Sequence, residues 1–193
     1  MKTTLLWALG GLIFGGIIHI FSVLWIPMTA EKDSWTQLAR LGPVNAFHRF
    51  PPAREGETTL PDMDPSLRYA VCRYDLSGGL LQITARVPPV YWSVTLYDRR
   101  GVNYYALNDR LVAGREITLW VATPRQLLAV APQSAEGSIS DERLLIGAPA
   151  EIGFAVFRAL VPGPSHETVV AEALDATRCA VVGPRGAANP GAG

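Results

Sequence analysis

The sequence predicts a mainly β protein: an N-terminal transmembrane helix followed by a β-sandwich with one or two short helices. Three observations support this fold class. An uncharged apolar run lies near the N-terminus, apolar and polar residues alternate in short segments from residue 67 onward, and Gly-, Pro- and Asp-containing turn signals separate those segments. The expected organisation is an anchor at 1–30, a short helix and linker at 31–66, the sandwich at 67–182 and a disordered tail at 183–193.

The N-terminal run is long enough to cross a bilayer. Residues 5–26 are nearly all apolar, and 22 residues cover about 33 Å at about 1.5 Å each, against a hydrocarbon core of about 30 Å. The alternative is a cleaved signal peptide. Its apolar part normally has about 7–15 residues and precedes a small-x-small site, whereas 28–30 here begins with a large methionine. We expect a retained, single-pass anchor.

The remaining chain alternates between strand and turn signals. Residues 32–41 predict a short amphipathic helix that Gly42 and Pro43 end, and residues 50–65 read as a connecting loop. Helix signals occur near 124–130 and from Pro164. Gly101 supplies a positive φ in one hairpin turn. We expect about seven strands, at 67–74, 80–87, 90–97, 102–107, 116–121, 144–146 and 152–160.

The two cysteines bear on the compartment. Cys72 and Cys179 have neither CxxC spacing nor a histidine cluster nearby, so no metal site is expected. They are compatible with one disulfide in an oxidising compartment, or with two unrelated buried thiols. The flanking charges Lys2, Lys32 and Arg40 do not settle the orientation of the helix. A disulfide together with an anchor would favour a protein of the inner membrane whose C-terminal domain is periplasmic.

The composition excludes several function classes. Seventeen basic and 17 acidic residues balance, so there is no basic excess to attract nucleic acid. No GxSxG motif, phosphate loop or dinucleotide fingerprint occurs in its required context, and we expect no cofactor. The function expected is therefore a non-enzymatic binding or accessory module of the cell envelope.

Polar side chains around one predicted hairpin are the candidate binding site. Loops at one end of a sandwich often bind ligands. The expected site comprises Tyr97, Asp98, Asn103, Asn108, Asp109 and Arg110. If Asp98 and Asp109 approach each other, they could instead serve a carbohydrate-active or other hydrolytic enzyme, which needs two carboxylates about 5–10 Å apart. A third reading is that both aspartates only build turns.

The apolar helix also carries a candidate interface. Gly11 and Gly15 form a GxxxG step, and His19 follows four residues later on the same face. Glycine allows close approach of two backbones, and a neutral histidine in hydrocarbon needs a hydrogen-bonding partner. This face would pair with a second copy of the chain or with another membrane subunit of the envelope.

Several short motifs resemble one known family. They are Tyr-Asp-Leu-Ser at 74–77, Tyr-Trp-Ser-Val-Thr-Leu-Tyr-Asp at 91–98 and Gly-Val-Asn at 101–103. These segments resemble domain of unknown function 1254. His-Ile at 19–20, Phe-His-Arg at 47–49 and Arg-Cys at 178–179 are similar to its short membrane-anchored form, typical of alphaproteobacteria. The resemblance implies a β-sandwich and attaches no activity to it.

Overall fold

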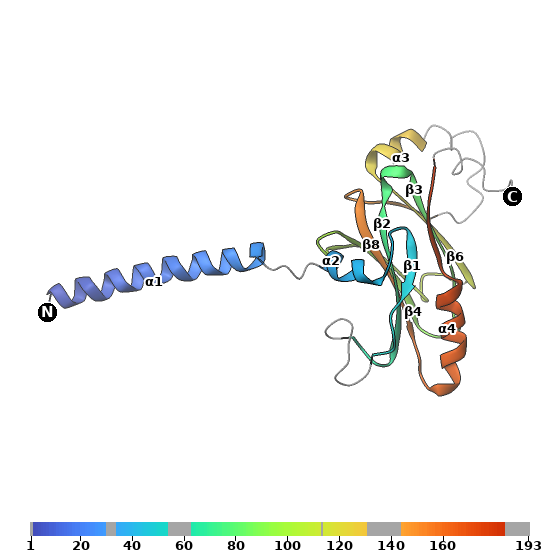
Figure 1. Cartoon of the computed structure of the whole chain (residues 1–193), viewed down its shortest axis with the longest axis horizontal. Helices are drawn as coiled ribbons and strands as arrows, with labels where there is room; N and C mark the ends of the chain where they lie inside the picture. Colours follow the sequence, from blue (N-terminus) through green and yellow to red (C-terminus); the bar gives the residue numbers. More distant parts are fainter. Residues whose placement is uncertain (1, 30–33, 54–62, 113, 131–143, 184–193) are drawn as a thin grey trace. The chain divides into compact units, whose positions relative to one another are not determined.

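A computed structural model describes residues 2–29, 34–53, 63–112, 114–130 and 144–183 of the chain (Figure 1). The chain divides into two compact units, Met1–Asp33 and Ser34–Gly193. The first unit is the helix α1 (Lys2–Thr29), which has 28 residues. Its apolar part, Thr3–Trp25, has 23 residues and a mean hydropathy of 1.9. This length and composition suit either a membrane anchor or a signal sequence.

The second unit contains two β-sheets, which confirms the mainly β fold (Figure 1). The first sheet is antiparallel and has the order β1 (Ala46–Arg49), β2 (Leu67–Asp75), β8 (Ile152–Leu160), β4 (Trp92–Asp98) and β5 (Asn103–Asn108). The second has the order β7 (Leu144–Gly147), β6 (Glu116–Ala122), β3 (Leu80–Arg86) and β9 (Arg178–Val182), with β7 parallel to β6. The helical segments are α2 (Ser34–Leu38), η1 (Ala39–Leu41), η2 (Leu76–Gly78), α3 (Pro124–Val130), η4 (Pro164–His166) and α4 (Glu167–Ala176).

Alternation along each strand builds the core between the sheets. Because successive side chains point to opposite faces, β4 turns Trp92, Val94 and Leu96 inward, as the sequence predicts. They meet inward residues of β3 and β6 from the second sheet in one continuous buried cluster. Complete burial of a side chain of this size contributes about 1.5–3 kcal/mol.

The outer face of the five-stranded sheet is partly covered by the segment that follows the helical unit. Leu38 at the end of α2 is buried against Val71 and Phe154, outward residues of β2 and β8. The guanidinium of Arg73 lies 4.9 Å from the ring centroid of Trp35, a cation–π contact. The compact unit therefore begins at Ser34, earlier than the sandwich boundary expected at residue 67.

Helix α4 is tied to the first two strands by paired charges. Arg68 donates to both carboxylate oxygens of Glu167, at 2.8 and 2.6 Å. Arg49 donates from Nη1 to both oxygens of Asp175, at 2.9 and 2.8 Å. The Arg68 contact, made through two guanidinium nitrogens, is fork-like and fixes orientation as well as adding free energy.

Two strands were not predicted from the sequence. Strand β1 falls in the predicted linker and β9 follows α4; they have four and five residues. Segments this short show too little alternation to be recognised alone. The helix expected at 32–41 is present as α2 and η1. Apart from Gly183, the tail expected at 183–193 lies outside the described residues.

Candidate functional site

The structure divides the predicted polar cluster between the two ends of one hairpin. Tyr97 and Asp98 end β4 and Asn103 begins β5, so these three lie at the turn. Asn108 ends β5 opposite Ser93, and Asp109 and Arg110 follow it at the other end.

The two aspartates therefore do not meet. Asp98 and Asp109 flank the whole of β5, whose six residues span about 20 Å at about 3.3 Å each. Paired glycosidase carboxylates are only about 5–10 Å apart. The approach of Asp98 to Asp109 that the hydrolytic alternative requires is absent, because the two residues sit at opposite ends of the same strand.

Hydrogen bonds show what these side chains do locally. Asp98 Oδ1 accepts from the backbone N–H groups of Arg100 and Val102, at 2.8 and 2.9 Å. Gly101 in the same turn has φ of 86°, the positive value the sequence predicts. Asn108 Oδ1 accepts from the backbone N–H of Arg110 at 3.1 Å. Asp98 and Asn108 are thus turn-building residues.

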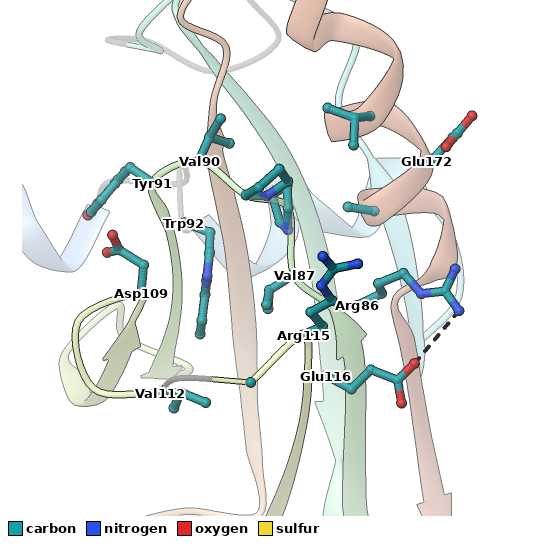
Figure 2. A pocket seen from close by; sticks show the side chains of 15 residues that line it. Arg86, Val87, Val90, Tyr91, Trp92, Asp109, Val112, Arg115, Glu116 and Glu172 are labelled. Carbon is teal, nitrogen blue, oxygen red and sulfur yellow. Dashed lines mark ion pairs between the residues drawn. The ribbon is translucent and has the colours of Figure 1, made fainter.

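A recess of about 1000 Å³ lies beside the Asp109 end of the hairpin (Figure 2). The β3–β4 connection, the β5–β6 connection and α4 form its walls. Of the predicted cluster, only Asp109 lines it. The lining residues are Arg86, Val87, Pro88, Pro89, Val90, Tyr91, Trp92, Asp109, Val112, Gly114, Arg115, Glu116, Val169, Glu172 and Ala173.

The recess is lined by apolar residues and by side chains of both charges. Figure 2 shows Tyr91 and Asp109 on one side and Glu172 and Glu116 on the other. Arg86 pairs with Glu116 at 3.7 Å, but both side chains are at least 70% exposed, so this pair adds little stability. The rim therefore offers charged groups that a partner can engage.

Sequence reasoning missed most of this recess. Pro88 and Pro89 fall between the strands predicted at 80–87 and 90–97, and the connection that they form shapes one wall. The contribution of Glu172 could not be foreseen, because it depends on where α4 packs.

At the turn end of the hairpin, the buried Tyr74 meets the half-buried Tyr104. The hydroxyls of Tyr74 and Tyr104 are 2.6 Å apart, and Tyr74 also donates to the carbonyl oxygen of Tyr97 at 3.2 Å. Burial raises the pKa of Tyr74 to about 12, partly offset by the Tyr104 hydrogen bond. Burial and the neighbouring Tyr74 also raise the pKa of Tyr104. Both phenols therefore stay protonated at neutral pH, and their role here is structural.

The two cysteines form a disulfide that connects the sheets. Cys72 lies in β2 of one sheet and Cys179 in β9 of the other, and their Cα atoms are 6.4 Å apart. The sequence left open whether the two cysteines form a disulfide or are unrelated buried thiols, and the structure contains the disulfide. Among the described residues, no group of three or more His, Cys, Asp or Glu side chains is placed to hold a metal.

The small-residue face of α1 is open in the isolated chain. A side chain added at Gly11 or Gly15 would meet no atom within 4 Å. His19 is exposed on the same helix. Within the helical unit itself, no side chain covers Gly11 or Gly15.

Residues 44–181 match the family described as "Protein of unknown function (DUF1254)". The chain belongs to the DUF1254 family. The match starts with the residues just before β1 and ends within β9, so it covers most of the sandwich that the structure describes. The resemblance seen in the sequence motifs is thereby confirmed.

A solved structure supports the fold of this DUF1254 domain. The VPA0106 protein from Vibrio parahaemolyticus is similar with a TM-score of 0.56 at 12% identity, over 76% of this chain and 32% of that one. An uncharacterised protein from Burkholderia cenocepacia has a TM-score of 0.46 at 20% identity, over 72% of this chain and 35% of that one. The chain thus spans about a third of each structure. No curated protein matches it.

Proposed function

We propose that this DUF1254 protein is a non-enzymatic binding or accessory module of the cell envelope. Helix α1 is its retained inner-membrane anchor, the sandwich is periplasmic, and a partner protein or envelope ligand binds in the recess. The observation that carries the binding role is the recess itself, which brings apolar and charged side chains together in one hollow. The proposed partner presents an apolar group to the exposed ring of Tyr91 and charged groups to the rim.

The disulfide supports the proposed compartment. Disulfides persist in oxidising compartments such as the periplasm and are rare in the cytosol. A domain with Cys72 joined to Cys179, preceded by an apolar helix of spanning length, fits a periplasmic domain on an inner-membrane anchor.

Photocrosslinking from the recess tests the binding role. A photoreactive phenylalanine analogue at Tyr91, which is 45% exposed in the recess, should give a specific adduct in native membranes. The matched control is the same analogue at Val102, which is 60% exposed at the other end of the hairpin. Adducts that are absent at Tyr91, or equally strong at both positions, would refute the proposal.

The membrane topology needs a separate test. Alkaline phosphatase fused after residue 185 should be active, and the protein should resist carbonate extraction. An inactive fusion, or a mature protein that starts at Glu31, would contradict the retained periplasmic topology.

The anchor is proposed to associate through its small-residue face. Replacing Gly11 and Gly15 by isoleucine keeps the helix apolar, so insertion should survive while association weakens. His19 would hydrogen-bond across this interface, to a second copy or to another membrane subunit. Identical crosslinked partners for the wild type and the double variant would show that this face is not an interface.

A further inference from the structure

Arg158 lies on the outer face of the five-stranded sheet and does not line the recess. Its neighbours on β8, Phe157 and Ala159, point into the core, so Arg158 points outward. It pairs with Tyr69 on β2 and Ser93 on β4. None of these outward residues lines the recess.

The guanidinium of Arg158 is bound only by neutral groups. Nη2 donates to Thr95 Oγ1 at 3.0 Å and to the Tyr97 hydroxyl at 3.1 Å. Nε is buried and has no hydrogen-bond partner. Within the described part of the chain, no carboxylate forms an ion pair with it.

Other arginines of this sheet are paired differently. Arg68 and Arg49 each hold a carboxylate of α4 with two hydrogen bonds. Arg73 stacks on Trp35 and donates to the carbonyl of Gly42 at 2.9 Å. Arg158 differs from all three because its desolvated Nε has no acceptor, and an unpaired, partly buried charge is costly.

The surrounding sheet face has a positive charge balance. In the cross-strand rows from Tyr69 to Arg73, strands β2, β8 and β4 present two arginines, Arg73 and Arg158, and no acidic side chain. A bound anion would compensate this charge, and low local dielectric would strengthen the interaction.

We propose that Arg158 and Tyr97 form a binding site for an oxyanion, a carboxylate or a phosphate group. The Tyr97 hydroxyl accepts a hydrogen bond from Arg158, so its own proton is free to donate outward. Its ring stacks on Phe154, with centroids 5.0 Å apart and planes at 14°, which fixes the hydroxyl in place. Arg158 Nη1, which donates to no described residue, supplies the charged donor, in the planar geometry that carboxylate and phosphate both fit.

This site is independent of the proposed function, because it uses a different face of the sandwich. It also gives Tyr97, a residue of the predicted cluster, a ligand-binding role apart from the hairpin turn. Arg158 itself had no sequence signal, because its significance depends on the cross-strand neighbours that the sheet register supplies.

Nuclear magnetic resonance of arginine side chains tests the proposal on the full chain in non-ionic detergent. The Nε–Hε signal of Arg158 is assigned by its loss in the Arg158→Gln variant. Sodium phosphate and sodium acetate are then titrated separately at mildly acidic pH, with chloride keeping the ionic strength constant. The matched control is the signal of Arg100, an exposed arginine in the hairpin turn, assigned in the same way.

The Arg158 signal should shift to saturation with at least one of the two anions, while the Arg100 signal should not saturate. The anion that saturates at the lower concentration identifies the ligand as a phosphate or a carboxylate. Replacing Tyr97 by phenylalanine should weaken binding roughly three- to tenfold, as expected for one lost hydrogen bond. An Arg158 signal that does not saturate with either anion, or an affinity unchanged in Tyr97→Phe, would overturn the proposal.

Discussion

Replacing Tyr74 by phenylalanine would remove the middle of a three-member hydrogen-bond chain. The single proton of the Tyr74 hydroxyl is donated to the Tyr97 carbonyl, so the Tyr104 hydroxyl must donate to Tyr74. The change would leave the Tyr104 hydroxyl without this acceptor and would remove one hydrogen bond from the Tyr97 carbonyl. Tyr104→Phe, in contrast, would leave the Tyr74 donation intact.

This difference sets the expected magnitudes. The unsatisfied Tyr104 hydroxyl costs about 1–3 kcal/mol, and the hydrogen bond lost at the Tyr97 carbonyl adds about 0.5–1.5 kcal/mol. We therefore expect Tyr74→Phe to lower the free energy of unfolding by about 2–4 kcal/mol. Tyr104→Phe loses one hydrogen bond and should cost only about 0.5–1.5 kcal/mol. Tyr74 is the more sensitive position because it is fully buried.

Urea unfolding of the full chain in detergent, followed by tryptophan fluorescence, would measure both values. The buried Trp92 and Trp120 report on the sandwich. The reasoning would be refuted if Tyr104→Phe cost as much as Tyr74→Phe, since the direction of the hydrogen-bond chain would then be wrong.

The same pair predicts a dependence on alkaline pH. An unfolded tyrosine ionises near pH 10, whereas burial raises the pKa of folded Tyr74 to about 12. The stability from this group is therefore fully present below about pH 10 and is lost as pH rises towards about 12. The free energy of unfolding should fall across that window, and less steeply in Tyr74→Phe.

Three further changes can be measured in the same unfolding assay. Replacing Cys72 and Cys179 together by alanine removes a disulfide of sequence separation 107. Chain entropy suggests that the free energy of unfolding falls by about 4–5 kcal/mol. A fall of less than about 1 kcal/mol would contradict this prediction. Gly153→Ala should cost more than about 2 kcal/mol, because an added Cβ would overlap the Tyr74 hydroxyl, whereas Gly163→Ala meets open space. Asp98→Ala should cost about 1 kcal/mol, like a lost cap, and leave crosslinking from the recess unchanged.

The strands could be predicted because burial imposes a period of two on the sequence. In β4, Trp92 and Ser93 differ in polarity because they face the core and the outer side of the sheet. The same alternation does not give the order of strands. The placement of β8 between β2 and β4, far from both in sequence, depends on long-range pairing.

The candidate site was predicted less well for a related reason. Asp98 and Asp109 are close along the chain, but the strand between them, β5, separates them in space. The recess and the environment of Arg158 both combine residues from distant segments. Such sites follow from register and from the packing of α4, which local patterns do not encode.

The disulfide also determines how the domain would respond to proteolysis. Strands β3 to β8 and helix α4 all lie between Cys72 and Cys179 along the chain. A protease that cuts one peptide bond anywhere between them would leave the two fragments covalently joined. Helix α1 precedes Cys72, so the C-terminal fragment would also remain attached to it. Nicked protein would migrate as one band without reductant and as two bands with it.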